Sequence, residues 1–491
     1  MTVCRTGVDK AKGCLTMSEA NRHAYTEPAR EVPVLGEWDV VVAGGGPAGC
    51  AAALAAARHG ARTLLVEREG YLGGATVAQL VCVILSTNGV DFQGTWHEYM
   101  AALKRLGGVT PQLRRGHGQI SGCVDPEMVK YAWDGLLAEA GVGILHLAWV
   151  AGAIVAEGAI QGILVETRGG RRALMARRVI DCTGDGAVCD RAGVGWDQGD
   201  GAHPWAMACT KVFRMGNVRR SKDFPNDAAM RKLADDLAAA IARGEFTTPV
   251  LTTKDRILGY VRGGAWALPP HRPELLSVIS RVLKVDPLDP WDLTRAEREG
   301  REQARQAAEF YRRYVPGFEQ AYLLDTSAHL GIRSSRRVHG LATVTARDAI
   351  EFRKYPDGIA RGSWEIDVWP ADSYTAPAVD RGSAEWRARR AKLEGGEYYD
   401  IRYGCIVAKG VDNLLVAGRC LSAEHQAEAS LRIQQTCIAT GQAAGTAAAL
   451  SLEEATTPRQ LDPAKVVAQL ARDRSAVEPA FDILKNLPIA P

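Results

Sequence analysis

The fold is decided by the stretch WDVVVAGGGPAG (residues 38–49) and the alanine-rich CAAALAAARHG (residues 50–60) that follows it. The apolar run before the glycines predicts a buried strand, and the alanine-rich segment predicts a helix that ends at Gly60. A second apolar run, TLLVE (residues 63–67), predicts another strand, which ends on an acid. Strand, glycine turn, helix and strand in this order are typical of a βαβ unit that binds a dinucleotide.

Each part of the glycine turn has a physical task in such a unit. Gly44 supplies the tight turn, Gly46 leaves no side chain where the backbone meets a diphosphate, and Gly49 lets helix and strand pack closely. Pro47 and Ala48 begin the helix, whose free N–H groups and positive dipole end favour phosphate. We therefore assign these five residues to a cofactor site.

The acid at the end of the second strand supports this interpretation. The Glu67 carboxylate can accept hydrogen bonds from ribose hydroxyls there, and we assign it to the cofactor site together with the adjoining Arg68. A G-x-G-x-x-G pattern alone is also compatible with a purely structural turn. The agreement of strand, helix and terminal acid favours the dinucleotide site.

A second glycine-rich segment favours FAD over a nicotinamide cofactor. GYLGGAT (residues 70–76) directly follows the second strand, where a nicotinamide dehydrogenase would not need it. Small residues there would let the backbone wrap the diphosphate and ribityl chain of a longer cofactor. IDCTGDG (residues 180–186) adds another strand and glycine turn. Because only one full fingerprint occurs, we do not expect a separate NAD(P)H domain.

The whole pattern predicts an α/β fold: a Rossmann-type FAD-binding domain with a central parallel sheet and an antiparallel meander, plus an inserted mixed α+β substrate or cap region. The expected order is a poorly ordered tail (1–35), a first FAD-binding segment (36–90), a helical insert (91–142), the meander with the second cofactor turn (143–200), the cap region (201–400), a last FAD-binding segment (401–455) and a C-terminal helical tail (456–491).

Composition restricts the partners. The 491 residues are 46% hydrophobic and 24% charged with a net charge of +3, which gives no sign of nucleic-acid or membrane-surface binding. No apolar run is long enough to span a bilayer, and the N-terminal tail lacks the apolar core of a signal peptide. The 11 cysteines are scattered without a Cys-x-x-Cys pair, so we expect reduced thiols in a cytoplasmic protein and no metal site. A homodimer is compatible with the sequence, and the electron acceptor stays open.

Several stretches resemble known flavoproteins. The run DVVVAGGGPAGCAAALAAARHGARTLLVEREGYLGGAT (residues 39–76) is similar to the opening of the glutathione-reductase-type flavoproteins. GIRSSRRVHG (331–340), EYYDIRYGCIVAKGVDNLLVAGRCLSAEHQ (397–426) and SLRIQQTCIATGQAAGTAAA (430–449) resemble the bacterial FAD-dependent oxidoreductase family typified by HdrA-like single-chain flavoproteins. The chain lacks the cysteine-rich segments of heterodisulfide-reductase subunits, so we expect no iron–sulfur cluster in it.

The resemblance implies an FAD bound by the first βαβ unit and contacted again by the C-terminal segment. It places the glycine turn beside the flavin, the meander strand near the adenine, the second cofactor turn, and the late strand end near the ribityl chain. Many relatives carry an acid after the late glycine where this chain has an arginine, which leaves the contact of that arginine open. The implied positions are Gly74, Ala75 and Thr76; Val150; Thr183 and Gly184; and Gly418 and Arg419.

A long helix of small residues follows the late strand. We expect it to begin near Thr436 and to point its N-terminus at the pyrimidine edge of the flavin, where the helix dipole would stabilise negative charge on the reduced ring. Gly441 and Gly445 suit a close approach to another backbone. Tight helix packing alone would also explain these residues.

Flavin would supply the redox chemistry, and the protein must orient a substrate and manage a proton. His425, after the late strand, is our first candidate base, with a surface or capping histidine as the alternative. His117, on a glycine-flanked loop, is the second, with an ordinary turn histidine as the alternative.

The basic group Arg333, Arg336 and Arg337 offers a bidentate clamp for a substrate carboxylate, and we assign this task to Arg333. Ion pairing with Asp325, Asp348 or Glu351 is the alternative, and arginines four apart would share a face if the segment were helical.

These features predict an FAD-dependent dehydrogenase or oxidase. It would transfer a hydride from a C–OH or C–N carbon of a small polar metabolite, with or without a carboxylate, to flavin N5. An FAD-dependent monooxygenase and a flavin-bearing electron-transfer subunit of a larger complex are the alternatives.

Overall fold

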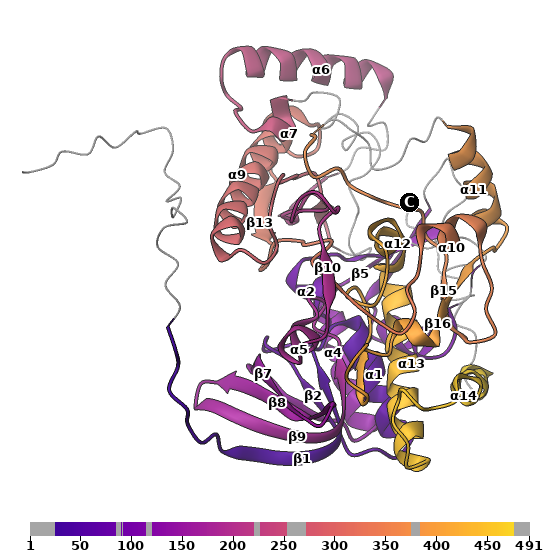
Figure 1. Ribbon diagram of the computed structural model, residues 1–491. Helices are drawn as coiled ribbons and strands as arrows, with labels where there is room; N and C mark the ends of the chain where they lie inside the picture. The colour runs from indigo at the N-terminus through magenta and orange to yellow at the C-terminus, as the bar shows by residue number, and fades with distance from the viewer. Residues whose placement is uncertain are drawn as a thin grey trace, which may run out of the picture.

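A computed structural model describes residues 25–84, 90, 92–113, 120–219, 226–252, 272–374 and 383–475. Its largest sheet has seven strands and lies at the bottom of the view in Figure 1. Five of these strands run parallel to their neighbours, and two complete the meander. The parallel strands are β1 (Val34–Ala43), β2 (Thr63–Val66), β6 (Gly143–Leu145), β9 (Gly170–Asp181) and β17 (Leu414–Val416).

The order of the parallel strands is that of a Rossmann fold. The sheet runs β6–β2–β1–β9, and β17 pairs with the far side of β9. The order in which successive strands are added to the sheet therefore reverses between β1 and β9, which is the switch point at which such sheets bind ligands. The carboxyl ends of β1, β2, β9 and β17 meet at one edge, so the segments that follow them in sequence are brought together there.

The meander shares β9 with the parallel sheet. β7 (Trp149–Ala156) and β8 (Ala159–Thr167) are antiparallel, and β8 pairs with the first half of β9 over residues 170–175. The last residues of β9 pair instead with β17, in the register Val179 to Leu414 and Asp181 to Val416. The predicted fold class is thus confirmed, including the return of the meander to the main sheet.

Two helices cross the sheet in close contact. α1 (Pro47–Arg58) and α13 (Gln434–Glu453) lie side by side in the centre of Figure 1. A Cβ atom added to Gly441 would come 2.1 Å from the Ala48 carbonyl oxygen, and one added to Gly445 would come 2.1 Å from that of Ala52. The expected close approach of this glycine pair to another backbone is confirmed.

Smaller elements complete the cofactor-binding part. The sequence predicted residues 91–142 to be helical, but they also contain strands. Val109 and Thr110 pair with Val124 and Cys123, and the β-branched side chains among them favour a pleated surface. The elements are α2 (Ala75–Ala78), β3 (Val83–Ile84), α3 (Thr95–Arg105), β4 (Val109–Leu113), β5 (Ile120–Val124), α4 (Pro126–Glu139), α5 (Ala187–Arg191), β10 (Trp196–Gln198), β14 (Arg336–Val338), α10 (Ala346–Glu351), β15 (Gly358–Gly362), α11 (Ala384–Glu394), β16 (Tyr399–Arg402), a 3-10 turn (Tyr403–Cys405), α12 (His425–Leu431) and α14 (Pro463–Ser475).

A second core lies at the top of Figure 1. It combines a three-stranded antiparallel sheet with three helices and centres on buried Phe213, Phe310 and Tyr311. Only part of the predicted cap region joins it, because Val344, Ile359 and Trp364 pack into the core of the cofactor-binding part instead. The elements of this second core are β11 (Phe213–Gly216), α6 (Asp227–Ala242), α7 (Pro249–Thr252), β12 (Leu275–Ser277), α9 (Pro290–Tyr314) and β13 (Tyr322–Thr326).

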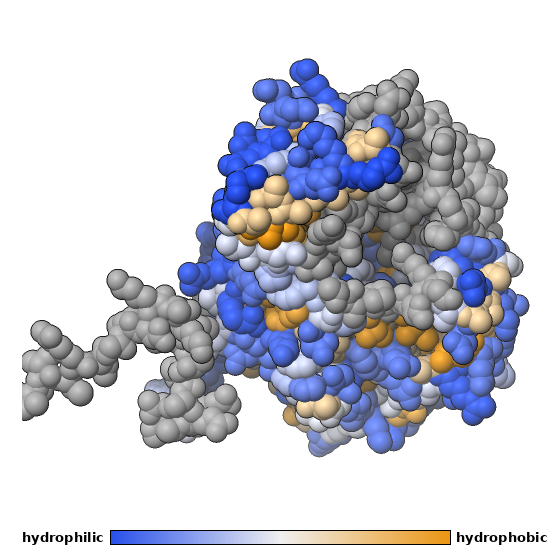
Figure 2. Space-filling model, turned by 90° about the horizontal axis from the view of Figure 1, so that it is seen from above, coloured by the Kyte–Doolittle hydropathy of each residue, from blue (hydrophilic) through white to orange (hydrophobic). Residues whose placement is uncertain are grey.

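The surface seen from above is mostly hydrophilic over the described residues, with smaller hydrophobic areas between the polar ones (Figure 2). Among the helices that the structure describes, none is both long and apolar enough to cross a bilayer.

We expect Gly445→Ala to destabilise the protein, because the added methyl group must push α13 away from Ala52; such overpacking costs about 1–3 kcal/mol. Gly135 in the exposed part of α4 is the matched control, since a Cβ atom there would meet no atom within 4 Å. Gly135→Ala should raise the free energy of unfolding by up to about 1 kcal/mol, because alanine is the better helix former. Denaturant unfolding measures both changes, and an unchanged or raised stability of Gly445→Ala would contradict the packing described.

Candidate functional site

The glycine turn after β1 is pressed against the end of β9. A Cβ atom on Gly44, whose φ is +99°, would come 2.5 Å from the Cys182 carbonyl oxygen. One on Gly49 would come 1.7 Å from the carbonyl oxygen of Gly44 itself. Both positions require glycine for the fold, as expected of a tight turn that enters a closely packed helix.

Gly46 differs from its neighbours, because an added Cβ atom would fit there without a clash. A Cβ atom there would meet only the Gly74 Cα atom, at 3.8 Å, and its φ of −75° is accessible to any residue. The fold therefore does not demand glycine at this position, whereas a ligand that approaches the backbone would. Pro47 and Ala48 follow as the first residues of α1, whose first-turn N–H groups lack helical partners.

The segment after β2 lies directly on this turn. The Gly73 N–H donates to the Gly45 carbonyl at 2.9 Å, and a Cβ atom on Gly74 would come 2.7 Å from the Gly46 Cα atom. Ala75 and Thr76 begin the short helix α2 immediately afterwards. The two glycine-rich stretches that the sequence separates by a strand thus form one backbone surface.

The late segment closes the same region. A Cβ atom on Gly418, which follows β17, would come 2.9 Å from the Ala48 Cβ atom, and the Gly418 N–H donates to the Thr440 hydroxyl at 3.3 Å. Gly441 meets the Ala48 carbonyl, as described above. The start of α1, the end of β17 and the first turns of α13 are therefore in contact.

Two buried hydroxyls at this surface suit a bound cofactor. The Oγ1 atoms of Thr76 and Thr436 are buried and have no hydrogen-bond partner among the described residues. Leaving a buried polar group unpaired costs free energy, so such atoms suit a polar ligand. Together with the open backbone at Gly46 and the start of α1, they fit a dinucleotide whose diphosphate lies at the glycine turn and whose ring lies toward α13.

Glu67 helps to build the turn. Its Oε2 accepts a hydrogen bond from the Gly45 N–H at 2.5 Å, and its Oε1 accepts one from the Glu69 N–H at 2.8 Å. Burial raises the pKa of Glu67, and these two hydrogen bonds oppose the rise. Each carboxylate oxygen can still accept a further hydrogen bond, so the predicted ribose contact stays compatible with this arrangement.

Arg68 and Val150 lie near Glu67. The Ala148 N–H donates to the Glu67 carbonyl at 3.1 Å, which brings the start of β7 to the end of β2. The Arg68 guanidinium lies 5.0 Å from the centre of the Trp149 ring and forms an ion pair with Glu69. Val150 is buried on β7. Because β7 starts beside the end of β2, the predicted adenine contact of Val150 and the predicted ribose contact of Glu67 would lie at the same end of the site.

The second cofactor turn is organised by Asp181, which the sequence reasoning missed. Its carboxylate accepts hydrogen bonds from the Thr183 N–H at 3.0 Å and hydroxyl at 2.7 Å, and from the N–H groups of Val188 at 2.8 Å and Cys189 at 2.9 Å. Asp181 thus caps α5 and fixes Thr183. The sequence signal that could have identified Asp181 is an acid at the end of the apolar run that forms β9.

Arg419, whose contact the sequence left open, holds this second turn. Its Nε donates to the Gly184 carbonyl at 2.9 Å, its Nη2 contacts the Asp185 carboxylate at 2.6 Å, and its Nη1 donates to the Ile332 carbonyl. The arginine therefore connects the end of β17 with residues 183–185 and with the segment before β14.

His425, the first candidate base, begins α12. Its Nδ1 atom is buried and has no hydrogen-bond partner in the part of the chain that the structure describes. Burial, followed by the charge of Arg337, lowers the pKa of His425 to about 4. Asp200 opposes this shift, and Arg432 adds the smallest contribution to it. The ring is therefore neutral at pH 7 and a weak base. His117 lies outside the described residues.

The guanidinium group of Arg333 already contacts other residues of the protein. One of its Nη atoms donates to the Ala208 carbonyl, and its guanidinium lies 5.2 Å from the centre of the Trp369 ring. Its assignment to a substrate carboxylate stays a prediction.

The expected ion-pair partners of the basic group are wrong. Asp325 binds Arg214, and Glu351 binds Arg347 and Arg353. Asp348 caps α10 and accepts from the Tyr355 hydroxyl.

The arginines contact acids that are distant in sequence. Arg336 pairs with Asp190 at 3.2 Å, and Arg337 pairs with Glu428 at 3.6 Å. Residues 336–338 form the strand β14, so adjacent side chains alternate between its two faces, and the helical arrangement does not apply.

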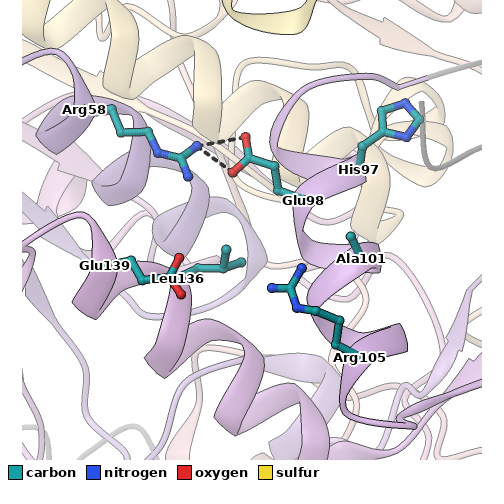
Figure 3. Close-up of a pocket in the computed structure, with 7 residues that line it drawn as sticks. All are labelled: Arg58, His97, Glu98, Ala101, Arg105, Leu136 and Glu139. Carbon is teal, nitrogen blue, oxygen red and sulfur yellow. Dashed lines mark hydrogen bonds and ion pairs between the residues drawn. The ribbon is translucent and has the colours of Figure 1, made fainter. Parts of the chain in front are cut away.

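A hollow of about 260 Å³ lies elsewhere, between α1, α3 and α4. Figure 3 shows Arg58 bonded to Glu98 across it, with His97 turned away from this pair. Arg58 ends α1, whereas the glycine turn precedes its first residue; a helix of this length separates the two by about 16 Å. The hollow is therefore not the cofactor site. Among the described residues, no group of three His, Cys, Asp or Glu side chains is arranged to hold a metal ion.

The fold and the backbone surface formed by the two glycine-rich stretches after β1 and β2 define a Rossmann-type dinucleotide-binding protein. The family model of the FAD dependent oxidoreductases matches residues 39–470, so the chain belongs to this family. It is an FAD-dependent oxidoreductase, and the expected cofactor is confirmed.

Similarity to individual proteins is more limited. A stretch of 96 residues is 38% identical to 3-oxosteroid 1-dehydrogenase of Mycobacterium tuberculosis (strain ATCC 25618 / H37Rv), and it covers 19% of this chain and 15% of that enzyme. A geranylgeranyl bacteriochlorophyll reductase-like protein from Thermoplasma acidophilum aligns over 92% of this chain and 89% of its own, with 13% identity and a TM-score of 0.41. The OxyS anhydrotetracycline hydroxylase from Streptomyces rimosus aligns over 92% and 68%, with 13% identity and a TM-score of 0.42.

We expect Gly46→Ala to separate cofactor binding from folding. The added methyl group meets no close protein atom, so the free energy of unfolding of the apoprotein should fall by about 1 kcal/mol or less, which is the cost of alanine at a helix N-cap. FAD affinity should fall at least about tenfold, because the methyl group occupies the space in front of the backbone. Flavin fluorescence quenching measures the affinity, and Gly49→Ala is the contrasting variant that should lose the fold. Unchanged FAD affinity in Gly46→Ala would remove Gly46 from the site.

Proposed function

We propose that this enzyme is a dehydrogenase or oxidase that takes a hydride from a C–OH or C–N carbon of a small polar metabolite. When bound, FAD supplies the hydride acceptor at N5. The protein then has to bind the polar end of the substrate, exclude water and accept a proton.

A buried polar cluster between β14 and α12 supports this proposal. We name it the Arg337 cluster; it contains Ser334, Arg337, His425, Glu428 and Arg432. Its guanidinium groups are incompletely paired, because Nε of Arg337 and Nε of Arg432 are buried without hydrogen-bond partners among the described residues. Nη1 of Arg337 lies 3.6 Å from the Glu428 carboxylate, as an ion pair without a hydrogen bond.

The chemistry of these atoms favours a polar substrate. Buried guanidinium N–H groups are donors only, so a ligand that satisfies them must bring acceptor oxygens. A carboxylate meets this need with two oxygens in the geometry of the guanidinium fork. A small carboxylated hydroxy or amino compound is therefore the substrate class that the Arg337 cluster suits best.

We expect the oxidised holoenzyme to bleach anaerobically with at least one compound from a panel of hydroxy acids, amino acids and sugars. Loss of flavin absorbance, followed in a stopped-flow spectrophotometer, is the measurement. Rapid bleaching by NADPH alone would favour a monooxygenase instead. Bleaching by none of the compounds, with turnover only beside a co-purifying redox partner, would favour an electron-transfer subunit.

With the compound that bleaches the wild type, Arg337→Gln should slow reduction at least about tenfold, since a lost charge-assisted contact costs about 1.4 kcal/mol or more. Arg347→Gln is the matched control, because Arg347 is exposed and, among the described residues, pairs with Glu351 along α10. Equal rates in Arg337→Gln and Arg347→Gln would show that the Arg337 cluster does not bind substrate.

A further inference from the structure

Glu428 is a carboxyl group enclosed in the protein with one oxygen unpaired. It lies on α12 and is 0% exposed. Its Oε2 accepts a hydrogen bond from the Ser334 hydroxyl at 2.6 Å, and an Arg337 nitrogen lies 3.6 Å from the same oxygen. Its Oε1 has no partner within the described ranges. An acid that served only to fix the structure would be expected to have both oxygens paired.

Opposing influences act on the charge of this group. Burial raises the pKa of Glu428 to about 7, although Ser334 and three arginines act to lower it. The charged and polar groups that act on it are Ser334 before β14, Arg337 on β14, Arg419 after β17 and Arg432 at the end of α12. His425 begins the same helix and is neutral at pH 7. Glu428 can therefore gain or lose a proton near neutral pH, where a weak base such as His425 cannot.

The surroundings of Glu428 connect it to the cofactor-binding edge. Ser335, next to its hydrogen-bond donor Ser334, donates to the Gly184 carbonyl at 3.3 Å and to the Asp185 carboxylate at 2.8 Å. Arg419 contacts the same turn and acts electrostatically on Glu428. α13 begins at Gln434, just beyond the end of α12. Glu428 is thus placed between the second cofactor turn and the start of α13.

We propose that Glu428 accepts the proton that is released when the substrate is oxidised, and holds it while the flavin is reduced. This inference rests on the proposed function. In the oxidation of a C–OH carbon, the C–H bond breaks and its electron pair leaves as a hydride to flavin N5. The O–H bond breaks as the C=O bond forms, and its proton forms a new O–H bond at Glu428 Oε1. For a C–N carbon the proton comes from the nitrogen.

The midpoint potential of the bound FAD tests this without any substrate. It is measured against redox dyes from about pH 5.5 to about pH 9 in the wild type, Glu428→Gln and Glu424→Gln. Glu424 is the matched control, because it is an exposed acid one turn away whose carboxylate accepts a hydrogen bond from the Ala346 N–H. Glutamine keeps the shape of a protonated glutamate but cannot exchange a proton.

Above about pH 7, reduction of the wild type should take up one proton more than reduction of Glu428→Gln. The wild-type potential should then fall by about 30 mV more per pH unit than the potential of the variant. One proton changes the equilibrium constant tenfold per pH unit, and for a two-electron couple a tenfold change equals about 30 mV. Below about pH 7 the two curves should run parallel. Glu424→Gln should follow the wild type throughout. A constant difference between wild type and Glu428→Gln over the whole range would overturn the proposal.

Ser334→Ala tests the same group if Glu428→Gln fails to fold or to bind FAD. Loss of the hydroxyl donor removes an influence that lowers the pKa of Glu428, so the change of slope should move to higher pH. A change of slope at the wild-type pH would overturn the proposal. Failure of the proposed function is a separate result, namely no bleaching of the wild-type flavin by any compound of the panel, and it leaves the potentials measurable.

Discussion

The close approach of backbone to backbone at the switch point of the parallel sheet is the constraint on which the rest depends. The turn after β1 lies against the end of β9, the loop after β2 lies against that turn, and α13 lies against the start of α1. At Gly44, Gly49, Gly441 and Gly445 a Cβ atom would come within 2.5 Å of a carbonyl oxygen. This packing aligns the segments that follow four different strands, and it leaves room at Gly46, where an added Cβ atom would come no closer than 3.8 Å to another part of the chain that the structure describes.

The same edge separates two kinds of environment. Toward β2 and β7 the site is formed by backbone and by Glu67, whose carboxylate accepts hydrogen bonds from the backbone of the turn. Toward β14 and α12 it is lined by charged side chains that the protein pairs incompletely. A dinucleotide cofactor needs the first environment for its diphosphate, and the proposed polar substrate would use the second. The FAD site and the proposed role of the Arg337 cluster can each be tested separately.

The sequence was sufficient for the features that depend on local patterns. The run over residues 38–67 contains its own strand, turn, helix and acid, so the βαβ unit and its place in a parallel sheet could be predicted. Small residues at regular spacing likewise predicted the contact of α13 with another backbone. The strands in residues 91–142 were missed because they are short and their pairing becomes visible only in three dimensions.

The polar contacts could not be predicted, because they join residues far apart in the chain. Arg337 pairs with Glu428 and Arg336 with Asp190, whereas the sequence suggested acids close to them. Burial lowers the pKa of His425 and raises that of Glu428, and Arg337 on another element adds to the first shift and opposes the second. The sequence identified the histidine of α12 and not the acid one turn further along the same helix.

A crystal structure of the protein with FAD bound tests the central claim most directly. We predict that the diphosphate lies in front of Gly46 and the first N–H groups of α1, and that the isoalloxazine ring extends toward Thr436 at the start of α13, on the side of the Arg337 cluster. A diphosphate bound away from Gly46, or a ring that points away from α13, would contradict it.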